Sequence, residues 1–542
     1  MDRYEQALRQ AGQMIFFGFD GYSVNRHALH AIQHTHLGNV ILFARNYQNP
    51  GQFFALIRQL QHLAAQANGA PLFTAADQEG GCVTRMTSGV TWFPGPMATR
   101  AAAGQPQLAQ QVGEAIGQEM ARMGLNMALA PVADLADDPD SAHIGSRSYG
   151  AAPQACAPFL RAFIQGAQRH VIATAKHFPS IGGSRVDLHL ALGQNSRSPA
   201  QLAAWEMAPV RAAVEAGVHA VMTSHEVYTG VENCPGTLSP ILLGTFLRRQ
   251  LGFRGLIISD CMEMQALCRR VPAPQACVRA VQAGVDLLLI CHTEQVQDAC
   301  AHALAQAICD GVIPRARVEE ALGRIAAFKA RLVLPTACPS PQADPLFARN
   351  RTLAQDICQR ALTLSGDLDL LRCRPDERFL LLAPPPAAST QADELNRAHG
   401  LCEAVQAAFP HAVCTEYPYP LAEEDLPRAL AQLGRGPFEK ILIATYNLHT
   451  DPGQQALLRA VQAAGPPVCA IALRTPYDAR WYDTAAAQLF AYDYTPPAVH
   501  AIVRAMRGAQ PCTGVLPADV QTVLLRKKER STGHVPTDDV LH

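Results

Sequence analysis

One short stretch of the chain gathers several groups that can move protons. The stretch 174–193, TAKHFPSIGGSRVDLHLALG, ends a strand-like run in Lys176 and His177 and continues to Asp187 and His189. In a loop, an aspartate two residues before a histidine can accept from one ring nitrogen, which fixes the tautomer and raises the basicity of the other nitrogen. With an ordinary pKa of about 6.5, His189 could act as acid and base near neutral pH. An isolated pair of this kind is also typical of a solvent-exposed loop.

Asp260 is a candidate nucleophile. It follows an apolar run within GFRGLIISDCMEM, 252–264. A carboxylate at the end of a buried strand is costly unless it is hydrogen-bonded or functional. As a nucleophile, Asp260 could attack the anomeric carbon of a sugar and form a glycosyl ester. The competing interpretation is that it caps the following helix.

Four further side chains could hold a sugar. Asp77 precedes the turn-forming pair Gly80-Gly81, so it could accept from sugar hydroxyls or merely cap the turn. Arg147, in a polar loop, could donate two parallel hydrogen bonds or form a surface ion pair. Lys176 and His177 could donate to hydroxyls, although Lys176 could equally be a structural cation beside a neighbouring aspartate.

These residues depend on a series of short apolar runs that alternate with amphipathic helical stretches. Each run is too short for a helix and is apolar along almost its whole length, which is typical of strands buried on both faces. The runs are 14–19, 39–44, 72–77, 127–134, 171–178, 219–227, 255–260 and 286–291. Eight such units predict a (β/α)8 barrel, a TIM-type α/β fold, with a doubly wound sheet as the alternative.

Polar residues stand at the carboxyl ends of five of these runs. They are Asp77, Asp134, Lys176 with His177, His225 and Asp260. In a parallel barrel those ends line one face, where barrel enzymes carry out their chemistry. We therefore expect these side chains to converge.

The chain is expected to contain two domains. We assign residues 1–335 to the barrel, and the Pro-rich segment 336–346, TACPSPQADPL, to a linker. Residues 347–510 read as a smaller α/β sandwich, and residues 511–542 as an extension that is partly disordered. The strands expected in the sandwich are 378–384, 440–447, 467–476 and 487–494.

Composition excludes several partners. The 542 residues are 49% hydrophobic and 17% charged, with a net charge of -1, so nothing favours a nucleic-acid partner. No apolar run reaches the roughly 18 residues of a membrane span, and no signal peptide is apparent. The sixteen cysteines form no C-x-x-C pair, as in proteins of a reducing compartment, so we expect a cytoplasmic protein.

The histidines at 27, 30 and 34 have helical spacing, but no carboxylate or cysteine completes a set of metal ligands with them. We therefore expect a polar helix face and no metal.

Seven segments together resemble one enzyme family. The chain resembles the β-N-acetylglucosaminidases of glycoside hydrolase family 3, in the branch that acts in peptidoglycan recycling. The resemblance covers residues 10–335. The segments that carry most of it are DQEGGCVTRM (77–86), APVADLADDPDSAHIGSRSYG (130–150), KHFPSIGGSRVDLH (176–189) and LGFRGLIISDCMEM (251–264).

This resemblance implies a (β/α)8 barrel and a retaining, two-step mechanism. We expect no cofactor and no metal, although Asp187 and His189 could form a metal site together with His177. By position, Asp260 would be the nucleophile and His189 the acid/base, paired with Asp187. The sugar-binding positions of the family fall on Asp77, Arg85, Arg147, Lys176 and His177. The implied activity is release of terminal N-acetylglucosamine from muropeptide- or chitin-derived saccharides. A phosphorylase, a β-glucosidase and a catalytically inactive sugar-binding barrel are the alternatives. The partner expected is a small saccharide, and the sequence does not distinguish a monomer from a homodimer.

The chain departs from the family pattern within its loops. The family's Gly-His-Gly is Ser180-Ile181-Gly182, its following aspartate is Gly183, and the residue between Asp187 and His189 is Leu188 rather than serine. An arginine of the family is Cys82. These changes concern the motion of the loop after residue 178 and the site beyond the first sugar.

Overall fold

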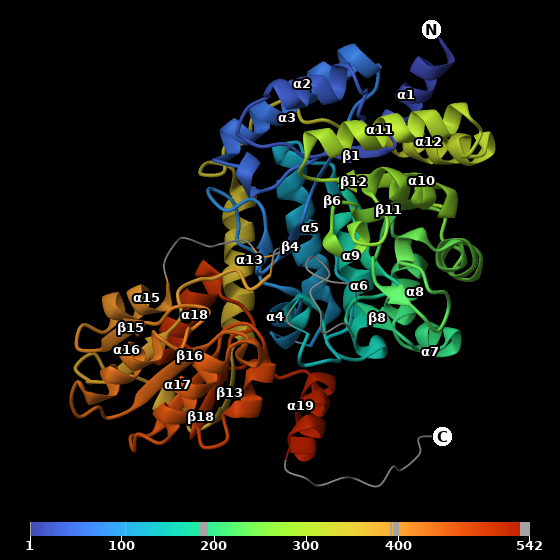
Figure 1. Cartoon of the computed structure of the whole chain (residues 1–542). Coiled ribbons are helices and arrows are strands. Elements are labelled where there is room, and N and C mark those ends of the chain that lie inside the picture. Colours follow the sequence, from blue (N-terminus) through green and yellow to red (C-terminus); the bar gives the residue numbers. More distant parts are fainter. Residues whose placement is uncertain are drawn as a thin grey trace. The chain divides into compact units, whose positions relative to one another are not determined.

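The computed structural model describes residues 2–102, 104–141, 143–183, 193–390, 393 and 400–531, with side chains as far as residue 525. The chain forms two compact units (Figure 1). The first comprises Met1–Phe93, Gln105–Leu135 and Cys156–Leu353, and the second Pro94–Gly104, Ala136–Ala155 and Ala354–His542. In the described part of the chain, no helix is both long enough and apolar enough to cross a bilayer.

The sheet of the first unit is a closed barrel of eight parallel strands. Around the barrel they are β1 (Ile15–Phe17), β12 (Leu287–Ile290), β11 (Leu256–Cys261), β9 (Ala220–Thr223), β7 (Ile172–Phe178), β6 (Met127–Ala128), β3 (Phe73–Ala76) and β2 (Asn39–Ile41). Each strand coincides with one of the eight apolar runs, with β11 extending one residue beyond the run 255–260, so the predicted barrel is confirmed. Apart from Asp260, every strand residue is buried, because helices outside and side chains inside cover both faces.

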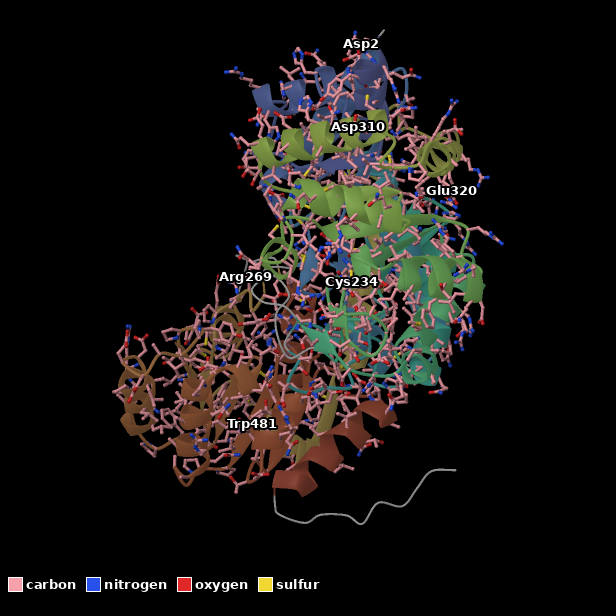
Figure 2. All side chains as sticks on the ribbon, turned by 45° about the vertical axis from the view of Figure 1, so that its right-hand side comes forward. Asp2, Cys234, Arg269, Asp310, Glu320 and Trp481 are labelled. Carbon is pink, nitrogen blue, oxygen red and sulfur yellow. The ribbon has the colours of Figure 1, made fainter. Side chains whose placement is uncertain are left out.

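Helices follow the barrel strands and begin and end at the expected sequence signals. In α3, the Asn49 side chain accepts from the backbone N–H of Gln52, Pro50 takes the first position, and Gly69 ends the helix at φ 66°. The helices are α1 (Arg3–Gln13), α2 (Arg26–Gln33), α3 (Pro50–Asn68), α5 (Pro106–Met123), α6 (Pro153–Ala167), α7 (Pro199–Ala204), α8 (Met207–Glu215), the π-helix η4 (Ile241–Gln250), α9 (Gln265–Cys268), α10 (Ala273–Ala283), α11 (Glu294–Cys309), α12 (Arg315–Lys329) and α13 (Pro345–Ala361). Charged side chains such as Asp310, directly after α11, and Glu320, in α12, lie exposed (Figure 2).

The loops of the barrel contain several short strands and 3-10 turns. Two small sheets pair β4 (Gln78–Gly80) with β5 (Val83–Thr84), and β8 (Gln194–Asn195) with β10 (Val227–Tyr228). The 3-10 turns are η1 (Ala44–Asn46) and η3 (Gly236–Leu238).

A buried aspartate secures the amino end of β12. Asp286 is fully buried and accepts from Arg248 at 2.7 Å and from Arg324 at 3.0 Å, and it also pairs with Arg317. The backbone N–H of Ile257 donates to it at 3.0 Å. An unpaired buried charge is costly. The arginines that neutralise Asp286 therefore connect η4 and α12 to the amino end of β12.

The second unit is built on a six-stranded sheet in the order β13-β18-β17-β16-β14-β15. Its strands are parallel except for β13, which is antiparallel to β18. They are β13 (Thr363–Gly366), β14 (Leu380–Ala383), β15 (Val413–Glu416), β16 (Ile441–Thr445), β17 (Val468–Ala472) and β18 (Ala487–Phe490). The remaining elements are α4 (Pro96–Ala101), η2 (Gly145–Arg147), α14 (Leu368–Leu371), α15 (Leu401–Ala408), α16 (Leu426–Leu430), η5 (Ala431–Gly434), η6 (Leu448–Thr450), α17 (Pro452–Gln462), η7 (Pro476–Trp481), α18 (Pro496–Met506) and α19 (Ala518–Ser531).

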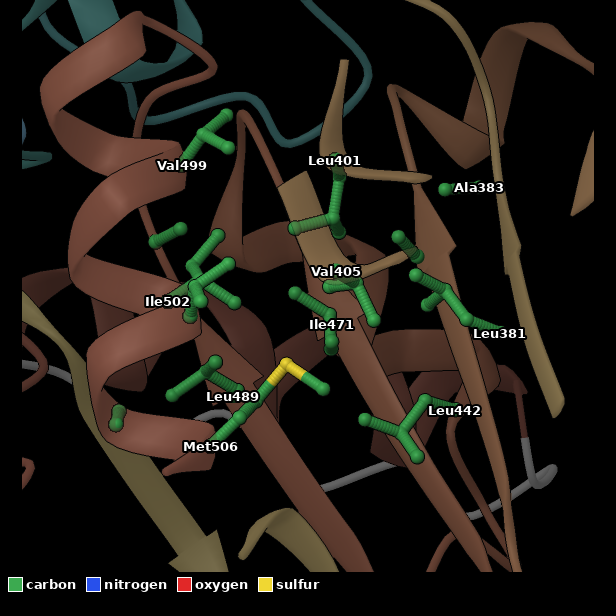
Figure 3. Close-up of a cluster of buried hydrophobic side chains, with 14 of the residues drawn as sticks. Leu381, Ala383, Leu401, Val405, Leu442, Ile471, Leu489, Val499, Ile502 and Met506 are labelled. Carbon is green, nitrogen blue, oxygen red and sulfur yellow. The ribbon is translucent and has the colours of Figure 1, made fainter. Parts of the chain in front are cut away.

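The core of this unit lies between the sheet and helices α15 and α18. Figure 3 shows side chains of the central strands facing those of the two helices. The strand side chains are Leu381, Leu442, Ile471 and Leu489, and the helical ones are Leu401, Val405, Val499, Ile502 and Met506. A separate mixed sheet with its own apolar core confirms the predicted α/β character of this region.

The second unit contains two edge strands and one helix that were not expected from the sequence. The edge strands β13 and β15 were not expected, because their residues are partly exposed and do not form an apolar run. Helix α19 occupies part of the segment expected to be an extension. Asp519 in its first turn pairs with Arg100 at 2.7 Å and accepts from the backbone N–H of Ala151 at 2.7 Å. The last of the divisions between the two compact units falls between Leu353 and Ala354, within α13. The expected domain boundaries, with a linker at 336–346, stay a prediction.

Candidate active site

The polar residues at the strand ends of the first unit converge. Asp77 follows β3, Asp134 lies beyond β6, Lys176 and His177 belong to β7, and Asp260 is in β11. Lys176 pairs with Asp77, and His177 pairs with Asp134 and lies near Asp260. Because all these strands run in one direction, the contacts gather at the carboxyl end of the barrel.

Asp77 belongs to a buried cluster of two anions and two cations. Lys176 Nζ lies 2.7 Å from Asp77 Oδ1 and 2.7 Å from Glu79 Oε1, while Arg85 Nη2 lies 3.0 Å from Asp77 Oδ2. Burial favours the neutral form of Asp77, but the two cations outweigh it and hold the pKa of Asp77 well below its usual value. Asp77 is therefore ionised and can accept hydrogen bonds from sugar hydroxyls.

Glu79 is a member of this cluster that the sequence analysis did not single out. Its side chain is only 1% exposed, whereas that of Asp77 is 14% exposed. Glu79 therefore serves to balance the charge of Lys176, and Asp77 is the carboxylate that ligands can reach. The spacing Asp-x-Glu, which places the two side chains on one side of an extended segment, is the signal that could have identified it.

His177 is oriented by Asp134. The ring Nδ1 lies 2.7 Å from Asp134 Oδ2, and the backbone N–H of His177 donates to the same oxygen at 3.1 Å. Burial would raise the pKa of Asp134, but the charge of His177 and hydrogen bonds from His177, Ile181 and Ser180 outweigh burial and lower it. An ionised Asp134 keeps the proton on Nδ1, so Nε2 is the ring atom that faces Asp260 Oδ2, 3.9 Å away.

Asp260 is an accessible carboxylate in an otherwise buried strand. Its side chain is 21% exposed, and its Oδ1 accepts from the backbone N–H of Cys261 at 2.7 Å. The next helix, α9, begins at Gln265 with Met264 at the cap position and no side-chain capping bond. Asp260 therefore does not cap that helix.

His225 has a supporting position. It is fully buried, with Nδ1 2.8 Å from Thr237 Oγ1 and Nε2 2.9 Å from the carbonyl oxygen of Cys261. His225 therefore ties the end of β9 to the carbonyl group of Cys261, the residue that follows Asp260.

Asp187 and His189 lie outside the described residues, but the segment that leads to them is anchored by described contacts. Ser180 Oγ and the backbone N–H of Ile181 donate to Asp134 Oδ1 at 2.9 and 2.7 Å. A side chain on Gly182 would meet the carbonyl oxygen of Leu135 at 2.3 Å. The departure from the family pattern at Ser180-Ile181 is thus part of a hydrogen-bonded anchor on Asp134.

Arg147 belongs to the second compact unit. It ends the 3-10 turn η2, is 4% exposed, and donates from Nη1 to the carbonyl oxygen of His143 at 2.6 Å. Burial is not typical of a surface ion pair. The contact of Arg147 with a sugar stays a prediction.

A cavity of about 620 Å³ lies at the opposite end of the barrel strands. Among its lining residues, Asn126 precedes β6, Val171 precedes β7 and His219 precedes β9. The amino ends of barrel strands contribute to stability rather than chemistry. The cavity is therefore separate from the carboxylates of the candidate site.

A (β/α)8 barrel supports many chemistries, and accessible, ionised carboxylates at the carboxyl ends of its strands are suited to the cleavage of glycosidic bonds. The N-terminal domain model of glycosyl hydrolase family 3 matches residues 7–328, more than half of the chain. The chain therefore belongs to glycosyl hydrolase family 3, and it is a glycoside hydrolase.

Individual relatives agree with this assignment. A beta-hexosaminidase from Nitrosomonas eutropha is 34% identical over 277 residues, which cover 49% of this chain and 77% of that protein. The structure of a glycoside hydrolase family 3 beta-N-acetylglucosaminidase from Paenibacillus sp. str. FPU-7 matches with a TM-score of 0.88 at 31% identity, covering 94% of this chain and 98% of that one. Beta-glucoside phosphorylase BglX bound to 2FGlc has a TM-score of 0.76 at 20% identity, with 95% of both chains covered. That last match is a likeness of fold.

Proposed function

We propose that the protein is a retaining exo-β-N-acetylglucosaminidase that releases terminal β-linked N-acetylglucosamine from muropeptide- or chitin-derived saccharides. The names of the beta-hexosaminidase and beta-N-acetylglucosaminidase relatives support this activity. The observation that carries it is the accessible Asp260 carboxylate beside a histidine that Asp134 orients.

The reaction requires two displacements at the anomeric carbon. In the first, Asp260 bonds to that carbon, the bond to the leaving oxygen breaks, and His189 gives this oxygen its proton. In the second, His189 takes a proton from water while the water oxygen attacks the same carbon and the ester to Asp260 breaks. Two displacements retain the configuration. The roles of Asp187 and His189 rest on the sequence resemblance.

The buried cluster around Lys176 suits the binding part of the reaction. Ionised Asp77 accepts from sugar hydroxyls, and Arg85 and Lys176 hold that carboxylate in place from two sides. Because its counter-ions are already bound, Asp77 needs no rearrangement when the sugar arrives. His177 Nε2 lies 3.9 Å from Asp260 Oδ2. With the ring proton held on Nδ1 by Asp134, Nε2 can accept a hydrogen bond from a hydroxyl of the sugar.

The state of the cysteines supports a cytoplasmic enzyme. All sixteen are free thiols, and Cys338 is the exposed one. Free thiols in this number persist in a reducing compartment.

The test is a comparison of an aryl β-N-acetylglucosaminide with an aryl β-glucoside, with and without inorganic phosphate, followed by NMR of the products. The proposal predicts a higher kcat/KM for the N-acetylated substrate and free N-acetylglucosamine, released first as the β-anomer, in both conditions. Sugar 1-phosphate as the main product would show that the enzyme is a phosphorylase. Phosphorolysis is chemically feasible because a neutral imidazole acid/base, unlike a carboxylate, does not repel an incoming phosphate. A preference for the glucoside would make it a β-glucosidase.

The same assay distinguishes an inactive sugar-binding barrel. In the proposal, Asp260→Ala loses turnover while the wild type keeps it. If both proteins bound the sugar but had equally negligible turnover, the proposed enzymatic activity would be rejected in favour of an inactive sugar-binding barrel.

A further inference from the structure

Three side chains that could bind a thiophilic metal ion lie close together next to the proposed nucleophile. Cys261 directly follows Asp260 in β11, while Cys291 and His292 directly follow β12. The two Sγ atoms and a ring nitrogen of His292 all lie within 4.8 Å of one another. Cys291 is 2% exposed and Cys261 8% exposed, and His292 is exposed. The cluster therefore has a buried side made of sulfur and an open side made of imidazole.

This ligand set and its spacing fit a tetrahedral thiophilic cation. Zn²⁺ binds cysteine sulfur at about 2.3 Å and histidine nitrogen at about 2.0 Å, which places neighbouring ligand atoms roughly 3.5 to 3.8 Å apart in a tetrahedron. The three ligand atoms lie within 4.8 Å of one another, so movements of about 1 Å would bring them to the spacing of such a tetrahedron. Two thiolates also balance the charge of a divalent ion without help from the carboxylates nearby.

Hydrogen bonds already hold the backbone of the second and third ligands. Arg45 Nη2 donates to the carbonyl oxygen of Cys291 at 2.7 Å. Glu263 accepts from the backbone N–H groups of His292 and Thr293 at 2.7 and 3.0 Å. Both polar groups of the peptide between Cys291 and His292, its carbonyl oxygen and its N–H, are therefore hydrogen-bonded. A metal ion binding there would not have to order the chain first.

The first ligand is fixed in a similar way from other elements. The carbonyl oxygen of Cys261 accepts from His225 Nε2 at 2.9 Å, and the backbone N–H of Met262 donates to the carbonyl oxygen of Leu289 at 2.8 Å. The ring of His292 lies against Phe43, with centroids 5.6 Å apart. The site thus joins two neighbouring barrel strands at a point where both backbones are immobilised.

We propose that Cys261, Cys291 and His292 bind a thiophilic divalent cation of the Zn²⁺ class, with water at the fourth, solvent-facing position. Binding releases the two thiol protons and forms two metal–sulfur bonds and one metal–nitrogen bond. The ion links the carboxyl end of β11 to that of β12, directly beside Asp260. The site is independent of the proposed reaction, which uses other side chains.

The experiment titrates the full-length protein, freed of metal by a chelator and kept reduced, with Zn²⁺ and with Cd²⁺ alone. Calorimetry measures affinity and proton release, and ultraviolet absorption measures the charge-transfer band of Cd²⁺–thiolate bonds. The wild type should bind one cation per chain with this band. Thermal unfolding should shift upward with cation, because binding to the folded state stabilises it.

Variants assign the ligands. His292→Ala, at an exposed position, should weaken binding by more than the roughly tenfold loss typical of outer partners of a metal site. Cys291→Ala should remove the charge-transfer band. Cys268→Ser is the matched control: Cys268 lies in α9 and its Sγ donates to the carbonyl oxygen of Met262 at 3.2 Å, so this variant should bind as the wild type does.

Three results would overturn the proposal. One is a wild type that gives no thiolate band at saturating Cd²⁺. A second is equal binding by the wild type, His292→Ala and Cys291→Ala. The third is a count of free thiols in the isolated protein that is two short and is restored by reductant at Cys261 and Cys291, which would show a disulfide in place of a metal site. None of these results depends on turnover, so they leave the proposed function to its own test.

Discussion

The ring Nδ1 of His177 lies 2.7 Å from Oδ2 of Asp134. The other oxygen of that carboxylate accepts from Ser180 and from the backbone of Ile181. One buried side chain therefore orients the histidine that faces Asp260 and also anchors the start of the segment that leads to Asp187 and His189. Asp134 links the fixed and the loop-borne parts of the candidate site, although it touches no reacting atom in the proposed mechanism.

Asp134→Asn tests this link. Asparagine keeps the volume but loses the charge and one acceptor, so His177 is no longer held in one tautomer and the anchor of residues 180–181 weakens. We expect kcat/KM to fall at least about tenfold with the fold retained, measured by steady-state kinetics and thermal unfolding. The control is Glu215→Gln, an exposed carboxylate of α8 that pairs with Arg161, which should leave kcat/KM unchanged. Equal kinetics for both variants would contradict the positioning role of Asp134.

His189→Ala tests the acid/base assignment. Without an acid, substrates with poor leaving groups should slow far more than activated aryl glycosides, since the latter need less protonation. The measurement is the dependence of kcat/KM on the pKa of the aryl alcohol, which should become steeper in the variant. A parallel loss for every substrate would remove His189 from proton transfer.

Lys176→Met tests the buried charge cluster. The substitution leaves Asp77 and Glu79 as neighbouring buried anions, so we expect a loss of roughly 3 to 5 kcal/mol in the free energy of unfolding. The double variant Lys176→Met/Glu79→Gln removes one of these anions and should recover part of that loss, as urea unfolding would show. Additive effects of the two changes would mean that Lys176 and Glu79 are not coupled.

Glu226→Gln tests a pH dependence of stability. Burial, then the charges of Asp134 and Glu206, raise the pKa of Glu226 to about 8, and its Oε2 has no hydrogen-bond partner among the described residues. In the unfolded chain this pKa is about 4.3. Between these values the folded state binds more protons, so the free energy of unfolding falls as pH rises.

Glutamine cannot titrate, so Glu226→Gln should lose less stability than the wild type between about pH 5 and pH 8. Urea unfolding at several pH values measures this slope. Identical slopes in the two proteins would show that Glu226 does not remain protonated in the folded state.

The barrel could be predicted because its strands are buried on both faces. Runs such as 39–44 and 286–291 are apolar without interruption, and the structure places a strand in each. The edge strands β13 and β15 could not be predicted in this way, because exposure on one face breaks the apolar run. Helix α19 depends on contacts of Asp519 with residues far away in the sequence, and local patterning does not contain that information.

The candidate site was predictable in part. Strand-end position identified Asp77, Lys176, His177 and Asp260, because parallel strands bring their carboxyl ends together. The role of Asp134 and the membership of Glu79 depend on pairing across strands, which a single sequence does not reveal. A single sequence also does not show that His225 forms a hydrogen bond with the carbonyl oxygen of Cys261.

The central claim is that Asp260 forms the covalent bond to the sugar. The most direct measurement uses an activated fluorinated analogue of β-N-acetylglucosamine, which forms the glycosyl ester and hydrolyses it slowly, followed by peptide mass spectrometry. The proposed mechanism predicts one sugar per chain, attached to Asp260 in the peptide that spans 252–264, and no label in Asp260→Ala. Label on another side chain of the wild type, or a sugar bound covalently to the Asp260→Ala protein after the same treatment, would contradict it.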